Sequence, residues 1–100
     1  MDDILDRLQT IIADRLANGR PDESYVAMLA AKGPTRIARK LGEEATETVI
    51  AALAESDEAL VGEAADLLFH LLILLGSRGL GLDEVRASAI IMAAREFEVS

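Results

Sequence analysis

Cysteine is absent from this chain of 100 residues, which also contains only two prolines, one tyrosine and two phenylalanines. The absence of cysteine excludes disulfides, thiolate zinc sites and cysteine nucleophiles, and it fits a reducing cytosol. No stretch alternates apolar and polar residues with a period of two, so we predict no β-strands. The N-terminus has no basic segment followed by an apolar one, so we expect no secretory signal and a cytoplasmic location.

Basic residues are also scarce: ten lysines and arginines stand against 18 acidic residues, which gives a formal net charge of −8. This balance argues against nucleic acid or an anionic membrane as the partner. Four of the bases nevertheless lie within nine positions, at Lys32, Arg36, Arg39 and Lys40. A basic cluster just ahead of an acidic motif suits a metal-bound polyphosphate, because the metal bridges the acids to phosphate and the bases hold the remaining phosphate charge.

The most apolar run covers residues 67–75, where His70 is the only polar residue. A helix over this run is apolar on every side, which predicts a position in the middle of a bundle. The run is too short and too interrupted to span a bilayer, which needs about 20 apolar residues. We expect residues 1–100 to form one domain, and we expect a second copy of the chain to cover part of this helix.

Helical periodicity and capping residues predict an all-α fold, a four-to-five-helix bundle of antiparallel helices completed by homodimerisation. Asp2 and Asp3 are start residues for a first helix that stops at Asn18–Gly19. A short helix is expected over 24–31, with Asp22 or Ser24 as its cap. Thr35 is the predicted cap of a helix that runs to about Ala54. Ser56 or Asp57 is the predicted cap of the central helix, which ends near Gly76, and Asp83 that of the last helix.

Two pairs of acids, each spaced three residues apart, border apolar helix faces. Glu63 and Asp66 share a face with His70 at the start of the most apolar run, and Glu44 and Glu47 repeat the spacing one helix upstream. Antiparallel packing of these two helices would gather four carboxylates into one cluster. Oxygen-rich clusters suit hard divalent cations, Mg²⁺ or Mn²⁺.

Ordinary structural explanations compete with this interpretation. A single acidic pair usually lies on a solvent-exposed helix face, whereas two pairs that border apolar helix faces favour a metal site.

We interpret His70 as a hydrogen-bonded histidine at the edge of the core. Di-iron bundle sites take Glu-x-x-His from two helices, and the chain has no second histidine. Lys40 is expected to pair with Glu44 at i,i+4. Gly42 indicates either close helix packing or ligand access, and the sequence leaves both open.

Several segments closely resemble the phosphoribosyl-ATP pyrophosphatase family, which acts in the second step of histidine biosynthesis. They are residues 24–33, 40–47, 63–72 and 78–85, so the resemblance covers roughly 4–85, while 86–100 match no pattern that we can name. The E-x-x-E and E-x-x-D pairs belong to a wider superfamily of all-α nucleoside triphosphate pyrophosphohydrolases. The Ser24–Tyr25 dipeptide and the Lys-x-Gly-Glu-Glu sequence narrow the resemblance to this family.

The resemblance implies that water attacks the substrate between its α- and β-phosphates, so that 1-(5-phosphoribosyl)-ATP gives 1-(5-phosphoribosyl)-AMP and pyrophosphate. It also implies Mg²⁺, with Mn²⁺ as a substitute, and a homodimer of intertwined helices. The residues that match the superfamily's metal ligands are Glu44, Glu47, Glu63 and Asp66. Glu43 or Glu47 would orient the attacking water, and the phosphates would be held by Lys32, Arg36 and Lys40.

Two other functions stay open at the level of sequence. One is a house-cleaning pyrophosphatase of the same superfamily, which would act on ordinary or damaged nucleotides with the same metal chemistry. The other is a helical dimerisation module whose acids are solvated. Comparing the turnover of phosphoribosyl-ATP with that of other triphosphates distinguishes the two enzyme activities. A melting temperature that Mg²⁺ leaves unchanged would indicate the dimerisation module.

Overall fold

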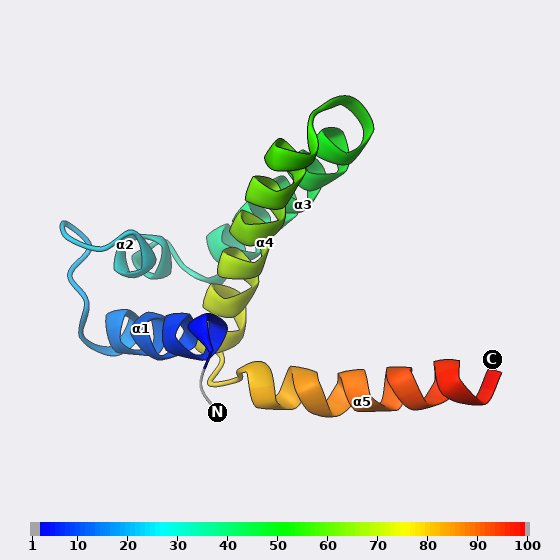
Figure 1. The fold of residues 1–100 in the computed structure, drawn as a ribbon. Coiled ribbons are helices and arrows are strands. Elements are labelled where there is room, and N and C mark those ends of the chain that lie inside the picture. The colour runs from blue at the N-terminus through cyan, green and yellow to red at the C-terminus, as the bar shows by residue number, and fades with distance from the viewer. Residues whose placement is uncertain (1–2, 100) are drawn as a thin grey trace.

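The computed structural model describes residues 3–99, which form five α-helices and, within that range, no strand (Figure 1). The helices are α1 (Ile4–Asn18), α2 (Tyr25–Ala31), α3 (Pro34–Ala54), α4 (Asp57–Ser77) and α5 (Leu82–Val99). The predicted all-α class is therefore confirmed, and the five elements match the five expected from periodicity.

At three helices, the structure selects one of the start residues that the sequence offered; Asp2, the other candidate at the first helix, lies outside the described residues. Asp3 accepts hydrogen bonds from the N–H groups of Leu5 and Asp6 at the start of α1. Ser24 and Ser56 each accept one from the N–H three residues on, which starts α2 and α4.

Two predicted caps are wrong. α3 begins at Pro34, because proline fits the first helical position, where its missing N–H needs no partner; Thr35 therefore lies inside the first turn. α5 begins at Leu82, so Asp83 also lies inside a first turn, and Glu84 accepts a hydrogen bond from the N–H of Gly81 instead.

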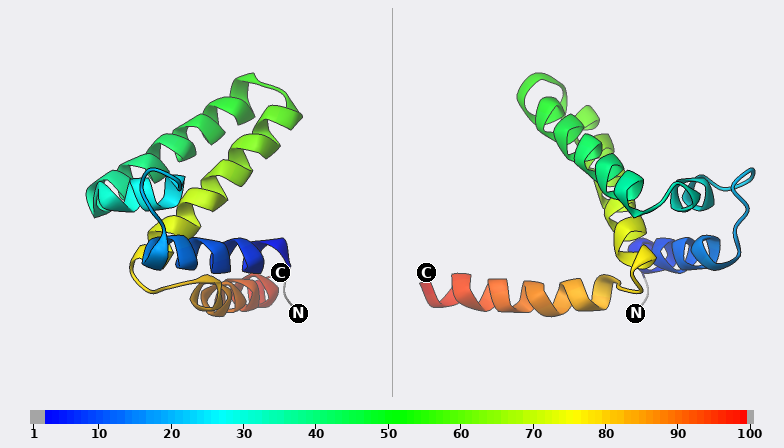
Figure 2. Two further views of the ribbon diagram at one scale, coloured as in Figure 1. Left: turned by 90° about the vertical axis from the view of Figure 1, so that its left-hand side faces the viewer. Right: turned by 180° about the vertical axis from the view of Figure 1, so that it is seen from behind.

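The chain reverses at residues 55 and 56, so that α3 and α4 form a long antiparallel hairpin (Figures 1 and 2). α1 and α2 pack against one half of this hairpin. The core that they share with it is small, and its buried members are Ile12, Val26, Leu29, Ile37, Leu72 and Ile73. The other half of the hairpin keeps large apolar side chains in solvent, including Leu53 and Val61, which are 84% and 68% exposed.

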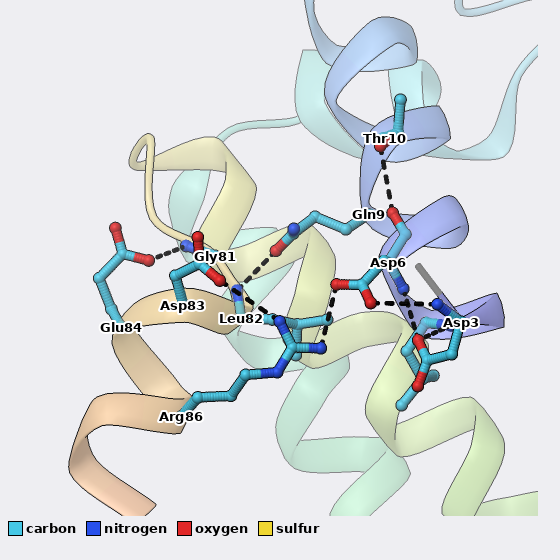
Figure 3. Close-up of polar contacts among 10 residues, drawn as sticks. Asp3, Asp6, Gln9, Thr10, Gly81, Leu82, Asp83, Glu84 and Arg86 are labelled. Carbon is cyan, nitrogen blue, oxygen red and sulfur yellow. Dashed lines mark hydrogen bonds and ion pairs between the residues drawn. The ribbon is translucent and has the colours of Figure 1, made fainter. Parts of the chain in front are cut away.

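Polar contacts fix the first turn of α5 to α1 (Figure 3). Gln9 accepts a hydrogen bond from the N–H of Leu82 at 2.6 Å, and Arg86 forms an ion pair with Asp6 at 3.0 Å. The N–H of Asp3 and the guanidinium of Arg86 together hold the pKa of Asp6 below its usual range. Beyond this turn, α5 extends away from the other four helices (Figure 2) and leaves Ile90 and Met92 exposed.

Among the described residues, one helix is long and apolar enough to cross a membrane by length and composition alone. It is α4, whose most apolar window has a mean hydropathy of 1.8 and is 17% buried. This helix is longer than the apolar run on which the expectation of too short a span rested, because it already begins at Asp57. Its polar residues Glu63, Asp66 and His70 lie close to groups on α2 and α3.

Candidate metal centre

The four acids of the two pairs lie together between α3 and α4. Glu44, Glu47 and Glu63 each place one carboxylate oxygen within 4.8 Å of those of the other two, so these three oxygens form one group of candidate ligand atoms. A second group of the same size joins Glu44 to Asp66 and His70. Glu44 belongs to both groups, so the structure has the predicted juxtaposition of the two pairs, with Glu44 at its centre. We call these four carboxylates the acid cluster.

The register of the two helices at the acid cluster is fixed by Thr48. Its hydroxyl lies 2.8 Å from the backbone carbonyl of Glu44 on its own helix and 3.3 Å from that of Glu63 on α4. Both bonds end on residues of the acid cluster. The hydroxyl therefore holds the two acid-bearing turns level with each other.

Two carboxylate oxygens in the acid cluster are buried without a hydrogen-bond partner among the described residues. Glu44 is only 3% exposed; its Oε1 lies 3.2 Å from the ammonium of Lys40, while its Oε2 has no partner. Oε2 of Glu63 is likewise buried without a hydrogen-bond partner. A buried unpaired polar atom typically costs about 1–3 kcal/mol. Unpartnered carboxylate oxygens beside one another on two helices are the donors that hard divalent cations take, so the donor set fits such an ion.

Lys40 and the acids themselves shift the pKa values within the acid cluster. Burial alone would raise the pKa of Glu44, but the ammonium of Lys40, 3.2 Å from Oε1, holds that pKa below its ordinary value. The pKa of Asp66 is raised, mainly by its partial burial and next by the neighbouring Glu44. The pKa of Glu47 is also raised, mainly by Glu44. The cluster thus holds a stable anion at Glu44 beside two carboxyl groups that keep their protons to higher pH than usual.

The residues predicted to act on phosphate or water are placed around the acid cluster in different ways. Lys40 lies beside it, with its ammonium 3.5 Å from Glu43 and 3.2 Å from Glu44, so the expected i,i+4 pair is confirmed. Glu43 stands outside both ligand groups, with half of its side chain exposed. Lys32 and Arg36 are exposed at the junction of α2 and α3. Arg36 is near enough to Tyr25 to oppose the rise in that tyrosine's pKa that burial causes.

His70 is a buried, hydrogen-bonded histidine at the edge of the core, as predicted. Its Nδ1 lies 2.8 Å from the backbone carbonyl of Asp66, and its Nε2 lies 2.7 Å from the hydroxyl of Tyr25. Tyr25 is the residue whose contact with the site the sequence does not reveal. It is 45 positions from His70, so no local spacing connects the two.

Gly42 has no neighbour that explains it. A Cβ atom added at this position would meet nothing within 4 Å in the described residues. Close helix packing inside one chain is therefore excluded as the reason for this glycine.

The pattern of acids agrees with a comparison to known protein families. A family model described as phosphoribosyl-ATP pyrophosphohydrolase matches residues 5–90. The chain belongs to this phosphoribosyl-ATP pyrophosphohydrolase family. The match includes α1 to α4 and extends into α5, five residues beyond the segment that the sequence resemblance covers.

Curated relatives named phosphoribosyl-ATP pyrophosphatase are similar along most of their length. The relative from Sphingopyxis alaskensis is 60% identical over 87% of this chain and 80% of its own length. The relative from Erythrobacter litoralis is 64% identical over 83% of this chain and 79% of its own. The relative from Metallosphaera sedula is 54% identical over 86% of this chain and 91% of its own. The family resemblance read from the sequence is thereby confirmed.

Proposed function

We propose that this protein hydrolyses 1-(5-phosphoribosyl)-ATP to 1-(5-phosphoribosyl)-AMP and pyrophosphate, the second step of histidine biosynthesis. Membership of the family and the names of the relatives support this reaction. The observation that carries it is the pair of buried, unpartnered oxygens of Glu44 and Glu63, which come from two different helices. A solvated acidic face would leave no such oxygens, so a purely structural dimerisation module does not account for them.

Glu44, Glu47, Glu63 and Asp66 would hold the metal ion, with Mg²⁺ as the cofactor and Mn²⁺ as a substitute. When bound, the ion polarises phosphoryl oxygens and neutralises the charge that develops during the displacement. Glu44 is best placed to be the central ligand, because it belongs to both groups of candidate ligand atoms. His70 is not proposed as a ligand, since both of its ring nitrogens have hydrogen-bond partners.

Glu47 is a better candidate than Glu43 for orienting the attacking water. Glu47 lies within the acid cluster, whereas the carboxylate of Glu43 is paired with Lys40 at its edge. Glu47 is also exposed, so water reaches its second oxygen. Catalysis of phosphoryl transfer consists largely of such positioning and of electrostatic stabilisation.

Lys32, Arg36 and Lys40 would hold the phosphates. Lys32 and Arg36 are exposed and form no ion pair with the described residues, so their charges are available to an anion. Lys40 now neutralises Glu44 and Glu43; a cation bound at the acid cluster would take over part of that task and leave the ammonium for phosphate.

We propose a homodimer as the working form, located in the cytoplasm, with a nucleotide substrate and neither nucleic acid nor a membrane as partner. The exposed apolar side chains on the outer half of the α3–α4 hairpin and on α5 support self-association. The net charge of −8 opposes binding to nucleic acid and to anionic lipid.

Turnover of phosphoribosyl-ATP by the purified protein, with pyrophosphate detected, tests the proposal. We expect activity that requires Mg²⁺ and stops with a chelator. Glu44→Gln and Asp66→Asn should each lower kcat/KM by at least about 100-fold, since a bound metal supplies several kcal/mol to the transition state. Glu55→Gln, an exposed acid between α3 and α4, is the matched control and should stay near wild type.

A panel of triphosphates decides between the family activity and house-cleaning hydrolysis. We expect phosphoribosyl-ATP to be preferred over ATP and the other common nucleotides. The proposed metal site is wrong if folded Glu44→Gln or Asp66→Asn keeps near wild-type turnover at saturating Mg²⁺.

A further inference from the structure

Aromatic and imidazole rings are rare in this chain, and most of them gather at the edge of the acid cluster. The chain has one histidine, one tyrosine and two phenylalanines. The rings of Tyr25 and His70 meet edge to face at 5.6 Å, and those of Phe69 and His70 do so at 5.3 Å. Tyr25 comes from α2 and the other two from α4, so this ring cluster joins α2 to the acid-bearing helix.

The hydrogen bonds of His70 determine which ring nitrogen carries the proton. Nδ1 lies 2.8 Å from the backbone carbonyl oxygen of Asp66, and a carbonyl only accepts hydrogen bonds, so Nδ1 is the donor. Nε2 of the neutral ring is then an acceptor. The hydroxyl of Tyr25, 2.7 Å away, donates its proton to it. Both nitrogens are thus engaged, one with α2 and the other with Asp66.

The carboxylate of Asp66 lies close to the same ring nitrogen. Its Oδ1 is 3.3 Å from Nδ1, while the hydrogen bond of Nδ1 goes to the backbone carbonyl oxygen of the same residue. The imidazole is buried, with 4% of its side chain exposed, whereas 47% of the Asp66 side chain is exposed. An exposed carboxylate has freedom to rotate, and the fixed ring beneath it restricts that freedom.

We propose that Tyr25 and His70 are positioning residues for the Asp66 carboxylate. Tyr25 orients the imidazole, and His70 donates from Nδ1 to the backbone carbonyl of Asp66 and lies 3.3 Å from its Oδ1. This inference rests on the proposed role of Asp66 as a metal ligand. Groups that hydrogen-bond to ligating carboxylates tune metal affinity, and their removal typically weakens binding about 10–100-fold. The cap that Ser24 makes at the start of α2 holds Tyr25 in place for this role.

The single histidine makes the first test possible on the wild-type protein. A long-range ¹H–¹⁵N spectrum of the whole chain contains one imidazole, so its signals need no assignment. We expect a neutral ring protonated at Nδ1 near neutral pH. A ring protonated at Nε2 would overturn the proposal, because Nδ1 would then have no proton to give to Asp66.

The second test measures binding of Mn²⁺ directly, by the EPR signal of the free ion, in folded variants. Tyr25→Phe removes the donor to Nε2, and we expect Mn²⁺ affinity to fall about ten-fold. Asparagine carries its amide nitrogen where the histidine has Nδ1, and glutamine carries it where the histidine has Nε2. His70→Asn should therefore bind Mn²⁺ more tightly than His70→Gln, which should lose about ten-fold or more.

Phe69→Leu is the matched control, because it disturbs the ring cluster without removing a polar atom. We expect Phe69→Leu to bind Mn²⁺ as the wild type does. The proposal is overturned if Tyr25→Phe also binds like the wild type, or if His70→Asn is no better than His70→Gln. Failure of the wild type itself to bind Mn²⁺ would instead refute the metal site, while the spectrum still decides the hydrogen-bonding of His70.

Discussion

Glu44 is the residue on which the electrostatics of the acid cluster depend. It is the most buried of the acids, it lies in both groups of candidate ligand atoms, and its Oε1 has the only cation in contact with the cluster's described members, Lys40. The pKa shifts of Asp66 and Glu47 both have Glu44 among their causes. Glu44 therefore makes the charged forms of Asp66 and Glu47 less favourable than they are in isolated carboxylates.

This arrangement predicts how metal binding depends on pH. A metal ligates deprotonated carboxylates, so binding must displace protons from Glu47 and Asp66 wherever their raised pKa values keep them protonated. Mn²⁺ affinity should fall as the pH drops through the range of these raised pKa values and should level off above it. Titrations with Mn²⁺ at a series of pH values measure this. An affinity that stays constant from neutral to mildly acidic solution would show that these carboxyls do not bind the ion.

Spacing alone predicted that the four acids lie together, but not which rings lie beside them. Glu44 and Glu47, and likewise Glu63 and Asp66, lie three residues apart, so helical geometry places each pair on one face wherever the helix packs. The contact between Tyr25 and His70 depends on how α2 docks on α4. That docking is a tertiary property, and no local pattern encodes it.

At the scale of the helices, the sequence narrowed the caps of α2 and α4 to two candidates each, Asp22 or Ser24 and Ser56 or Asp57, and the structure selects the serine in both. Ser24 and Ser56 each have a hydroxyl in reach of a free N–H, and both caps are present. At α3, the proline ring suits the first helical position, so the helix starts at Pro34 and the threonine that follows does not cap it. At Leu82, the start of α5 is set by Gln9 on α1, a partner 73 residues away. Capping serines and the proline are local signals that a sequence displays, whereas the contact with Gln9 depends on the tertiary fold.

Thr48 offers a test of how the acid-bearing helices are held in register. Thr48→Val keeps the side-chain shape but removes the hydroxyl that lies between the carbonyls of Glu44 and Glu63. We expect the free energy of unfolding to fall by about 1 kcal/mol. Thr46→Val is the matched control, because Thr46 is exposed and its hydroxyl bonds only to the carbonyl of Gly42 on its own helix.

Urea unfolding followed by circular dichroism measures both threonine variants. The control should change little, since valine and threonine have similar helix propensities. Equal losses in the two variants would mean that the hydroxyl of Thr48 does not link α3 to α4.

At the scale of the whole molecule, the single chain leaves much apolar surface uncovered. Leu53 and Val61 at the free end of the hairpin and Ile90 and Met92 on α5 are each more than 60% exposed. The sequence predicted that α4 needs more cover than one chain supplies. It did not predict the direction of α5, which polar contacts from Gln9 and Asp6 determine (Figure 3).

Self-association should therefore depend on the outer half of the hairpin. We expect the wild type to sediment as a dimer at micromolar concentration, and we expect Leu53→Ser to shift it toward monomer, because an exposed leucine buried on association contributes about 1.5–3 kcal/mol. Ala54→Ser, at the neighbouring exposed position, removes little apolar area and should leave the dimer intact. A wild type that sediments as a monomer contradicts the proposed homodimer.

The melting temperature with and without Mg²⁺ tests the central claim most directly, because it needs neither substrate nor a known active form. An ion that binds only the folded state at 100 times its Kd adds about 2.7 kcal/mol to the free energy of unfolding. We predict that Mg²⁺ raises the melting temperature of the wild type in a concentration-dependent way and leaves that of Glu44→Gln nearly unchanged. An equal response of the two proteins, or none in the wild type, would contradict a divalent-cation site between α3 and α4.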